Sequence, residues 1–442
     1  MPVPTLRLLI GGAALVSFVV GASAGDPWTL DRAVGVALEH SPDTRMARAR
    51  VEGAQALVEQ AQSAWLPQLS VSGRYTDTNN PMMAFGSILD QRAFNFALNF
   101  NHPGQIDNLD GAGTLAYNLY SGGRATAGRE AARAGAMAAD YDLRAARQSL
   151  EAEVVKTALN LRMAREGVAA LEAGVKAYQS AVSAAEARFG AGQLLKADLL
   201  SLKVELARTR EALSSARHGA ALAARAFRFV LGLDPSEEPV EFDSNDSSLR
   251  RLSTPDTRDY SQRPELLGLG ARERASAALV ASARAGHRPT VNAFATYQYD
   301  HGWQLGRGSD SWLAGVALDM NLFDGGQTSG RVHQAVADLA QVKEMRRKAE
   351  LGIALEVEKA RLSHEDALER LSVTDGAVDQ AEESASLSRA RFDKGALLPA
   401  DLIGAETRLI EARLRRSVAE SDERMAVVDL RRSLGLEPLP QP

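Results

Sequence analysis

The sequence predicts an α+β protein that is built twice, with two long helical hairpins and two pairs of strands. A twenty-residue stretch, Ala187–Leu206, returns 203 positions later as Ala390–Leu409 with ten identical positions. Helical periodicity runs over a very long stretch before each copy, and two segments of alternating polarity precede each of those stretches. The 442 residues therefore indicate one architecture made of two repeats rather than several unrelated domains.

Residues 1–24 have the pattern of an export signal. Arg7 supplies a positive charge, Leu8–Val20 is apolar, and a small-residue cleavage site follows at Ala22–Ala24. We therefore expect an exported chain that begins at Gly25. The chain contains no cysteine, which excludes disulfides and thiolate metal sites. With a formal net charge of −5 it lacks the basic footprint of a nucleic-acid-binding protein, so no nucleic-acid partner is expected.

Short helices begin each repeat. Trp28–His40 has apolar residues at helical spacing with Thr29 near its start, and Pro42–Trp65 follows as a second helix. The start of that second helix, at Ser41-Pro42-Asp43, has a counterpart 222 positions later at Arg263-Pro264-Glu265. Proline suits the first turn of a helix because its missing N–H needs no partner there.

Four segments alternate between apolar and other side chains: Leu69–Tyr75, Leu115–Leu119, Val291–Tyr299 and Val316–Leu322. This period is typical of a half-buried strand or of a transmembrane barrel strand, and with flanking residues each segment is long enough to cross a bilayer when tilted. After the signal no apolar run approaches twenty residues, so we expect only strands to enter a membrane. The alternative is two ordinary β-hairpins on a helical protein.

The loops within the two strand pairs differ. Thr76–Gly111 is long and contains the aromatic-rich Phe94–Phe100, whereas His301–Ser311 is short and rich in glycine. Because both strand pairs have their helices at the same end, we expect both loops on the far side of the membrane from the helices.

Gly122–Gly123 and Gly325–Gly326 mark the change from strand to helix. Arg124–Phe189 and Gln327–Phe392 then run without a proline, and at 1.5 Å per residue each helix is about 100 Å long. In the first of them, residues recur every seven positions at two heptad positions, which we call seams because they are expected to face a neighbouring helix. One seam consists of Val154, Leu161, Val168, Val175, Val182 and Phe189. The other consists of Leu150, Thr157, Ala164, Leu171, Tyr178 and Ala185. His364 takes a seam position in the second, and we interpret it as a polar seam residue rather than a metal ligand.

A shorter helix returns after each tip, over Ala197–Leu231 and Ala400–Leu434, and both end in Leu-Gly-Leu close to a proline. Stacked end to end with the helix before the strands, each is long enough to flank the long helix throughout. Asp234–Tyr260 is rich in Asp, Ser and Pro and is typical of a linker. We therefore expect a first repeat over 25–245, a linker over 246–262 and a second repeat over 263–442.

The repeated stretch itself has the pattern of a hairpin tip, at 188–198 and again at 391–401. Each copy has an Arg-Phe pair followed by a glycine that ends the long helix, and an aspartate in the first turn of the next helix: Arg188, Phe189, Gly192 and Asp198, then Arg391, Phe392, Gly395 and Asp401. This doubled Arg-Phe-x-x-Gly-x-x-x-x-x-Asp motif resembles the TolC family of outer-membrane efflux and secretion ducts. The resemblance extends over most of the chain, from about Trp28 to Leu436.

The resemblance implies a homotrimer with a periplasmic α-barrel and a transmembrane β-barrel to which each chain contributes four strands. It implies an outer-membrane channel of a tripartite efflux pump or type I secretion system, with a periplasmic extension in which substrate passes without chemical change. The expected partners are a periplasmic adaptor (membrane fusion protein), an inner-membrane transporter and outer-membrane lipid.

The resemblance also implies roles for the tip residues. Asp401 and its counterpart Asp198 match a periplasmic gate, although Gly404 and Ser201 stand where a second acidic ring would need carboxylates. The alternative for both aspartates is stabilisation of a helix N-terminus, worth about 0.3–1 kcal/mol. The adaptor-docking tip is expected at Arg188, Phe189, Gly192, Arg391, Phe392 and Gly395.

The strand count argues for an oligomer independently of any resemblance. Four strands cannot close a barrel, and an open sheet edge in lipid leaves backbone groups unsatisfied at several kcal/mol each. Two chains supply eight strands and three supply twelve, with room for a channel.

Two other classes of protein were weighed. A periplasmic coiled-coil adaptor without a pore is expected to have one helical hairpin, whereas this chain has two. An enzyme needs a catalytic constellation, and the one G-x-S-x-G match, at Gly21–Gly25, lies in the signal. Since no P-loop or H-E-x-x-H pattern occurs, we expect neither an enzyme nor a cofactor. The transported substrate is not readable from the sequence.

Overall fold

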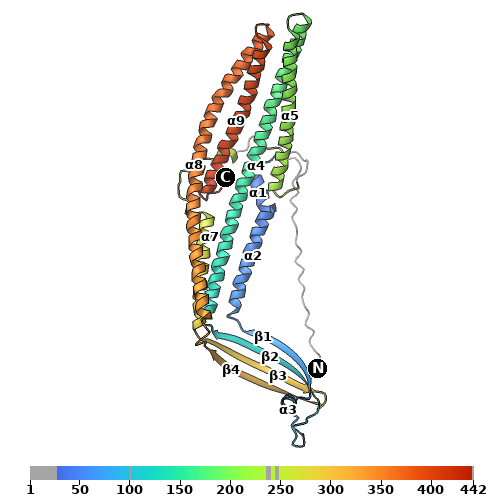
Figure 1. The fold of residues 1–442 in the computed structure, drawn as a ribbon, viewed down its shortest axis with the longest axis vertical. Helices are drawn as coiled ribbons and strands as arrows, with labels where there is room; N and C mark the ends of the chain where they lie inside the picture. Colours follow the sequence, from blue (N-terminus) through green and yellow to red (C-terminus); the bar gives the residue numbers. More distant parts are fainter. Residues whose placement is uncertain (1–26, 100, 235–239, 244–247, 441–442) are drawn as a thin grey trace, which may run out of the picture.

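The computed structural model describes residues 27–99, 101–234, 240–243 and 248–440. The molecule is elongated, with a sheet at one end and two helical hairpin tips at the other (Figure 1). The helices are α1 (Leu30–His40), α2 (Pro42–Ser63), α3 (Pro81–Asp90), α4 (Arg124–Gly190), α5 (Lys196–Val230), α6 (Ser248–Arg251), α7 (Pro264–Arg284), α8 (Gln327–Asp393) and α9 (Pro399–Ser433). The strands are β1 (Gln68–Thr78), β2 (Ile106–Tyr120), β3 (Thr290–Gly302) and β4 (Arg307–Asp319), and a 3₁₀ turn η1 (Ala285–His287) precedes β3.

The predicted duplication is confirmed. Helices α4 and α8 have 67 residues each, and α5 and α9 have 35 each. Both long helices begin after a Gly-Gly step in which both glycines have positive φ, 66° and 93° in the first repeat and 65° and 89° in the second. The two repeats therefore make the same turns at equivalent places, although half of the side chains differ even in the twenty-residue stretch that they share most closely.

The short helices stack end to end beside the long ones. Gly232, which has a φ of 72°, lies so close to the start of α2 that an added Cβ would meet the His40 carbonyl at 2.8 Å. Gly435 holds the same place against Arg263 at the start of α7. Arg263 is buried and its guanidinium donates to the Ser433 carbonyl and to Glu356. These two junctions make continuous columns of α5 with α2 and of α9 with α7.

The four strands form one antiparallel sheet in the order β1-β2-β3-β4. Its register brings the predicted apolar faces together, because Leu69 lies opposite Leu115, which lies opposite Ala295. The expected bounds of the fourth strand were wrong. It begins at Arg307 and ends at Asp319, so the connection to β3 is shorter than predicted and Met320–Leu322 lies beyond the strand.

The long loop of the first strand pair contains a helix that the sequence analysis missed. Asn80 caps α3 by accepting hydrogen bonds from the Met82 and Met83 amides, and Pro81 occupies the first turn. Ala84 and Ile88 bury the inner face of α3 against Ile106 at the start of β2. The segment is therefore a compact cover on the end of the sheet that lies farthest from the hairpins (Figure 1).

Two apolar clusters stabilise the helical part. One joins α1, α4, α5 and α9 about halfway along the hairpins, around Val154, Leu161 and Phe227. The other lies near the tips, around Tyr178, Leu202 and Phe392. No helix in the described part of the chain is long and apolar enough to cross a membrane.

The predicted export signal, residues 1–24, lies outside the described residues. Of the predicted linker, the described part includes α6 and a segment that reaches α8. There His364, which is buried, has its Nε2 2.9 Å from the Thr254 hydroxyl. Among the described residues no group of three or more His, Cys, Asp or Glu side chains is placed to hold a metal ion.

Candidate functional site: the hairpin tips

Each long helix ends in a Schellman turn. At tip 1, the α4–α5 turn, the Gln193 amide donates to the Arg188 carbonyl at 2.8 Å and Gly192 has a φ of 71°. At tip 2, the α8–α9 turn, the Ala396 amide donates to the Arg391 carbonyl at 2.9 Å and Gly395 has a φ of 77°. The left-handed glycine lets the backbone reverse within a few residues, so the next helix begins close beside the last.

The two tips touch each other within the chain. The Arg188 guanidinium lies over the Phe392 ring, 5.3 Å from its centroid, and donates to the Phe392 carbonyl at 3.3 Å. The same guanidinium lies beside Gly395, where an added Cβ would be 3.6 Å from Nη2. Phe392, which also belongs to the apolar cluster near the tips, is only 1% exposed, whereas its counterpart Phe189 is 42% exposed and Arg391 is exposed. Three of the predicted docking residues therefore meet at tip 2: Arg188, Phe392 and Gly395. The other three are exposed to solvent: Phe189, Gly192 and Arg391.

The two predicted gate aspartates occupy equivalent places. Asp198 lies in the first turn of α5 and Asp401 in the first turn of α9. Each is close to the positive end of its helix, where a carboxylate is stabilised. The N-cap residues, Leu195 and Leu398, provide no side-chain cap. Asp401 is exposed and Asp198 is half-buried.

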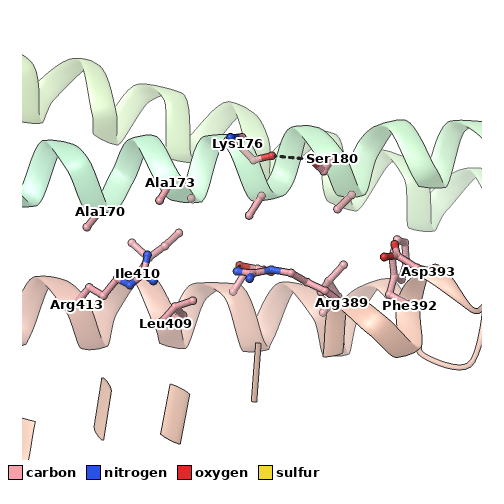
Figure 2. A pocket seen from close by; sticks show the side chains of 15 residues that line it. Ala170, Ala173, Lys176, Ser180, Arg389, Phe392, Asp393, Leu409, Ile410 and Arg413 are labelled. Atoms are coloured by element: carbon pink, nitrogen blue, oxygen red, sulfur yellow. Dashed lines mark hydrogen bonds and ion pairs between the residues drawn. The ribbon is translucent and has the colours of Figure 1, made fainter. Parts of the chain in front are cut away.

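A groove of about 320 Å³ runs between the two hairpins just below the tips (Figure 2). Its α4 wall consists of small side chains and one lysine: Ala170, Ala173, Gly174, Lys176, Ala177, Ser180 and Ala181. The opposite wall comes from α8 and α9: Arg389, Phe392, Asp393, Leu402, Glu406, Leu409, Ile410 and Arg413. The small residues on α4 let the backbones approach and leave the groove open at the surface.

An ion pair with one buried partner lies in the groove wall, because Glu406 is buried whereas Arg389 is partly exposed. Arg389 binds Glu406 through two hydrogen bonds, from Nε to Oε1 at 2.5 Å and from Nη2 to Oε2 at 2.7 Å. Glu406 is only 2% exposed, and its hydrogen bond raises the pKa of Arg389. The equivalent positions of the first hairpin are Glu186 and Lys203, which form an ion pair of reversed polarity at 2.7 Å. The two repeats therefore keep the pair and exchange its signs.

Tyr178 joins α4 to α9 beside the groove through hydrogen bonds of its hydroxyl. It is 1% exposed, and its hydroxyl lies 3.0 Å from the Thr407 hydroxyl and donates to the Ile403 carbonyl at 3.2 Å. Burial raises the pKa of this phenol, which stays protonated as a hydrogen-bond donor. The sequence analysis placed Tyr178 on a seam but did not identify its polar partners, which come from the other repeat.

Two repeated hairpins that rise from a single four-stranded sheet define a protein that forms part of a tube wall, with its specialised residues at the tips. The chain belongs to the outer membrane efflux protein family, whose family model matches residues 33–233 and 260–436. This confirms the resemblance to the TolC family. The chain accordingly lies in the outer membrane with its helices extending into the periplasm, and the family consists of transport channels rather than enzymes.

Individual relatives agree with this assignment. Protein CyaE of Bordetella pertussis is 26% identical over 358 residues, which cover 78% of this chain and 72% of that protein. The outer membrane protein VceC of Vibrio cholerae has a TM-score of 0.75 at 21% identity, covering 92% of this chain and 96% of that one. The CmeC outer membrane channel of Campylobacter jejuni has a TM-score of 0.77 at 17% identity, covering 93% and 87%. At these identities the two solved structures show the shared fold.

Proposed function

We propose that this chain is the outer-membrane channel of a tripartite efflux pump or type I secretion system. In this proposal it conducts substrate passively from a periplasmic adaptor and an inner-membrane transporter to the exterior. The observation that carries the proposal is the continuity between the tips and the sheet, since α4 and α8 each run without a break from the tip to the end of a strand. A wall of this form conducts only when several copies close it.

The proposed assembly is a homotrimer. Strands β1 and β4 are the two edges of the sheet, and the outer apolar side chains Val71 and Leu318 are 84% and 67% exposed in the single chain. In lipid these edges need partners because an unpaired backbone group costs several kcal/mol. Three copies provide twelve strands, which close a transmembrane barrel wide enough for a channel.

The proposed gate is formed by Asp401 and Asp198. In a closed ring of hairpins, the first turns of α5 and α9 face one another around the periplasmic entrance. Rings of carboxylates narrow such an entrance and select cations. Gly404 and Ser201 lie one turn farther along each helix and carry no carboxylate. Each hairpin therefore supplies one acidic residue to the gate rather than two.

The proposed docking site for the periplasmic adaptor is the adaptor-docking tip defined above, together with the groove below it. The groove is walled by helices and is lined along α4 from Ala170 to Ala181, which suits a helical hairpin laid along it. In this proposal the turns at Gly192 and Gly395 meet the end of that adaptor hairpin.

Reconstitution of the purified mature protein tests this function. Native mass spectrometry in detergent is expected to give the mass of three chains, and planar lipid bilayers are expected to show discrete ion conductance. A stable trimer that never conducts, even with Asp198 and Asp401 both replaced by alanine, would count against a channel.

A further inference from the structure

We propose that neighbouring copies are joined at the tips by Arg391 of one copy stacked on Phe189 of the next. This proposal rests on the homotrimer proposed above and adds to it the residues that make the contact between copies. Because the chain is duplicated, a contact that one repeat makes within the chain has an equivalent pair of residues in the other repeat, and that pair is not in contact within the chain.

The contact within the chain joins tip 1 to tip 2. Arg188, one residue before the end of the seam, covers the Phe392 ring and donates to its carbonyl. With this contact and its packing in the apolar cluster near the tips, Phe392 is 1% exposed. The contact is directional: the arginine of the first hairpin meets the phenylalanine of the second.

The duplicate of this contact is open in the single chain. Arg391 and Phe189 hold the equivalent positions, but Phe189 is 42% exposed and Arg391 is exposed. An added Cβ on Gly395 would meet Arg188, whereas one on Gly192 would meet nothing within 4 Å. The arginine and the phenylalanine that are paired as Arg188 and Phe392 therefore have counterparts, Arg391 and Phe189, that are exposed in the single chain.

Equivalent residues of the two long helices also differ in exposure, with those on α4 buried and those on α8 exposed. Leu159 and Ala170 of α4 are 2% and 9% exposed, and α4 packs against α9. Their counterparts on α8, Leu362 and Val373, are 52% and 67% exposed. Apolar side chains at this exposure, repeated at positions that are buried in the other repeat, indicate a surface that is covered in the assembly.

The matching surface lies on α5. Leu200 and Val204 are each 50% exposed, and they occupy the places that Ile403 and Thr407 hold on α9 beneath Tyr178. A second copy that presents its α5 to α8 therefore repeats the packing of α9 on α4. Because the contact joins two different surfaces head to tail, it closes only as a ring of copies.

The absence of cysteine from the sequence makes thiol cross-linking a direct test. Two differently tagged chains are coexpressed, one with Phe189→Cys and the other with Arg391→Cys. In a mixed ring of three copies, one contact then carries both cysteines and one contact keeps both native residues. After treatment with a short bismaleimide, we expect a covalent product that carries both tags and a linked peptide joining positions 189 and 391. The double variant Arg188→Cys, Phe392→Cys in one chain is the matched control, and it is expected to give the linked peptide at the mass of a single chain.

The outcomes separate this proposal from the proposed assembly. A trimeric native mass without the two-tag product, or with as much product from chains that all carry Phe189→Cys, overturns the contact and leaves the trimer standing. A native mass of one chain overturns both. Pairing Phe189→Cys with Lys343→Cys, far from the tip on α8, is expected to give no product.

Discussion

Replacement of Gly174 by alanine is expected to separate the two hairpins at the groove. An added Cβ at Gly174 would lie 2.4 Å from Ile410 Cδ1 and 2.9 Å from Ile410 Cγ1. Gly167, two turns earlier on the same helix, is the matched control because its added Cβ would be 3.5 Å from Leu414 Cδ2, an ordinary van der Waals contact. The two substitutions make the same chemical change in one helix and differ in the space available.

The magnitudes follow from two opposing effects. Each Gly→Ala change stabilises a helix interior by about 0.5–1 kcal/mol. Overpacking against Ile410 costs about 1–3 kcal/mol, because the isoleucine must leave its rotamer or α9 must move. Gly167→Ala is therefore expected to be stabilising, and Gly174→Ala to be neutral or destabilising by up to about 2 kcal/mol.

Hydrogen exchange of the purified protein in detergent measures this difference at the site. Amides of α4 around position 174 are expected to exchange about 5–150-fold faster in Gly174→Ala than in Gly167→Ala, the ratio that about 1–3 kcal/mol corresponds to. Adding Ile410→Ala should remove the penalty, so that Gly174→Ala becomes stabilising in that background. If Gly174→Ala slows exchange as much as Gly167→Ala does with Ile410 in place, the steric reasoning is wrong.

Three further changes have expected outcomes. Asp401→Ala should raise the conductance of the reconstituted pore because it removes charge and volume from the proposed gate, and an unchanged conductance would remove Asp401 from it. Arg188→Ala should weaken tip 2 by about 1–2 kcal/mol through loss of the stacking and hydrogen bond at Phe392, seen as faster exchange over residues 389–396. Burial, with the Glu437 carboxylate as a second cause, raises the pKa of Glu151 from its ordinary 4.5 to about 7. Between these two pH values the folded state therefore holds a proton that the unfolded state releases, and the contribution of Glu151 to stability is fully present below pH 4.5 and is lost as the pH rises through 7. Glu151→Gln should abolish this fall and be more stable at pH 8 by roughly 1–2 kcal/mol after allowance for solvent screening, as measured by heat denaturation across that pH range.

The features that local physics dictates were predictable from the sequence. The long helices, their glycine stops and the proline or Gly-Gly starts depend on residues within a few positions of one another, and the duplication showed each signal twice. Helix α3 depends on the same kind of signal, since Asn80 and Pro81 are a cap and a first-turn residue. The prediction of a loop was wrong there, because this helix has no counterpart in the second repeat and the duplication therefore does not indicate it.

The groove depends on contacts between repeats, and these were not predictable in the same way. Tyr178 and Thr407 are 229 positions apart, and nothing near either residue indicates the other. The start of β4 was predicted too far along the chain, at Val316 instead of Arg307, for a similar reason. Arg307–Ser311 is polar apart from one glycine and lacks an alternating pattern, but it pairs along β3 because the strand opposite holds it in register.

The exchanged ion pairs indicate how one repeated backbone provides two kinds of surface. Aligning Glu186 with Arg389 and Lys203 with Glu406 shows that the sign changes at both positions together, so each hairpin keeps an attractive pair. A change at one position alone would place like charges opposite each other within a hairpin. In a closed ring, grooves within a chain and grooves between chains alternate, and the pair facing each groove has the opposite polarity from its neighbours. In the proposed trimer, an adaptor hairpin would therefore meet two electrostatically different kinds of groove, which is a physical reason for the two repeats to have diverged in charge while their turns stayed the same.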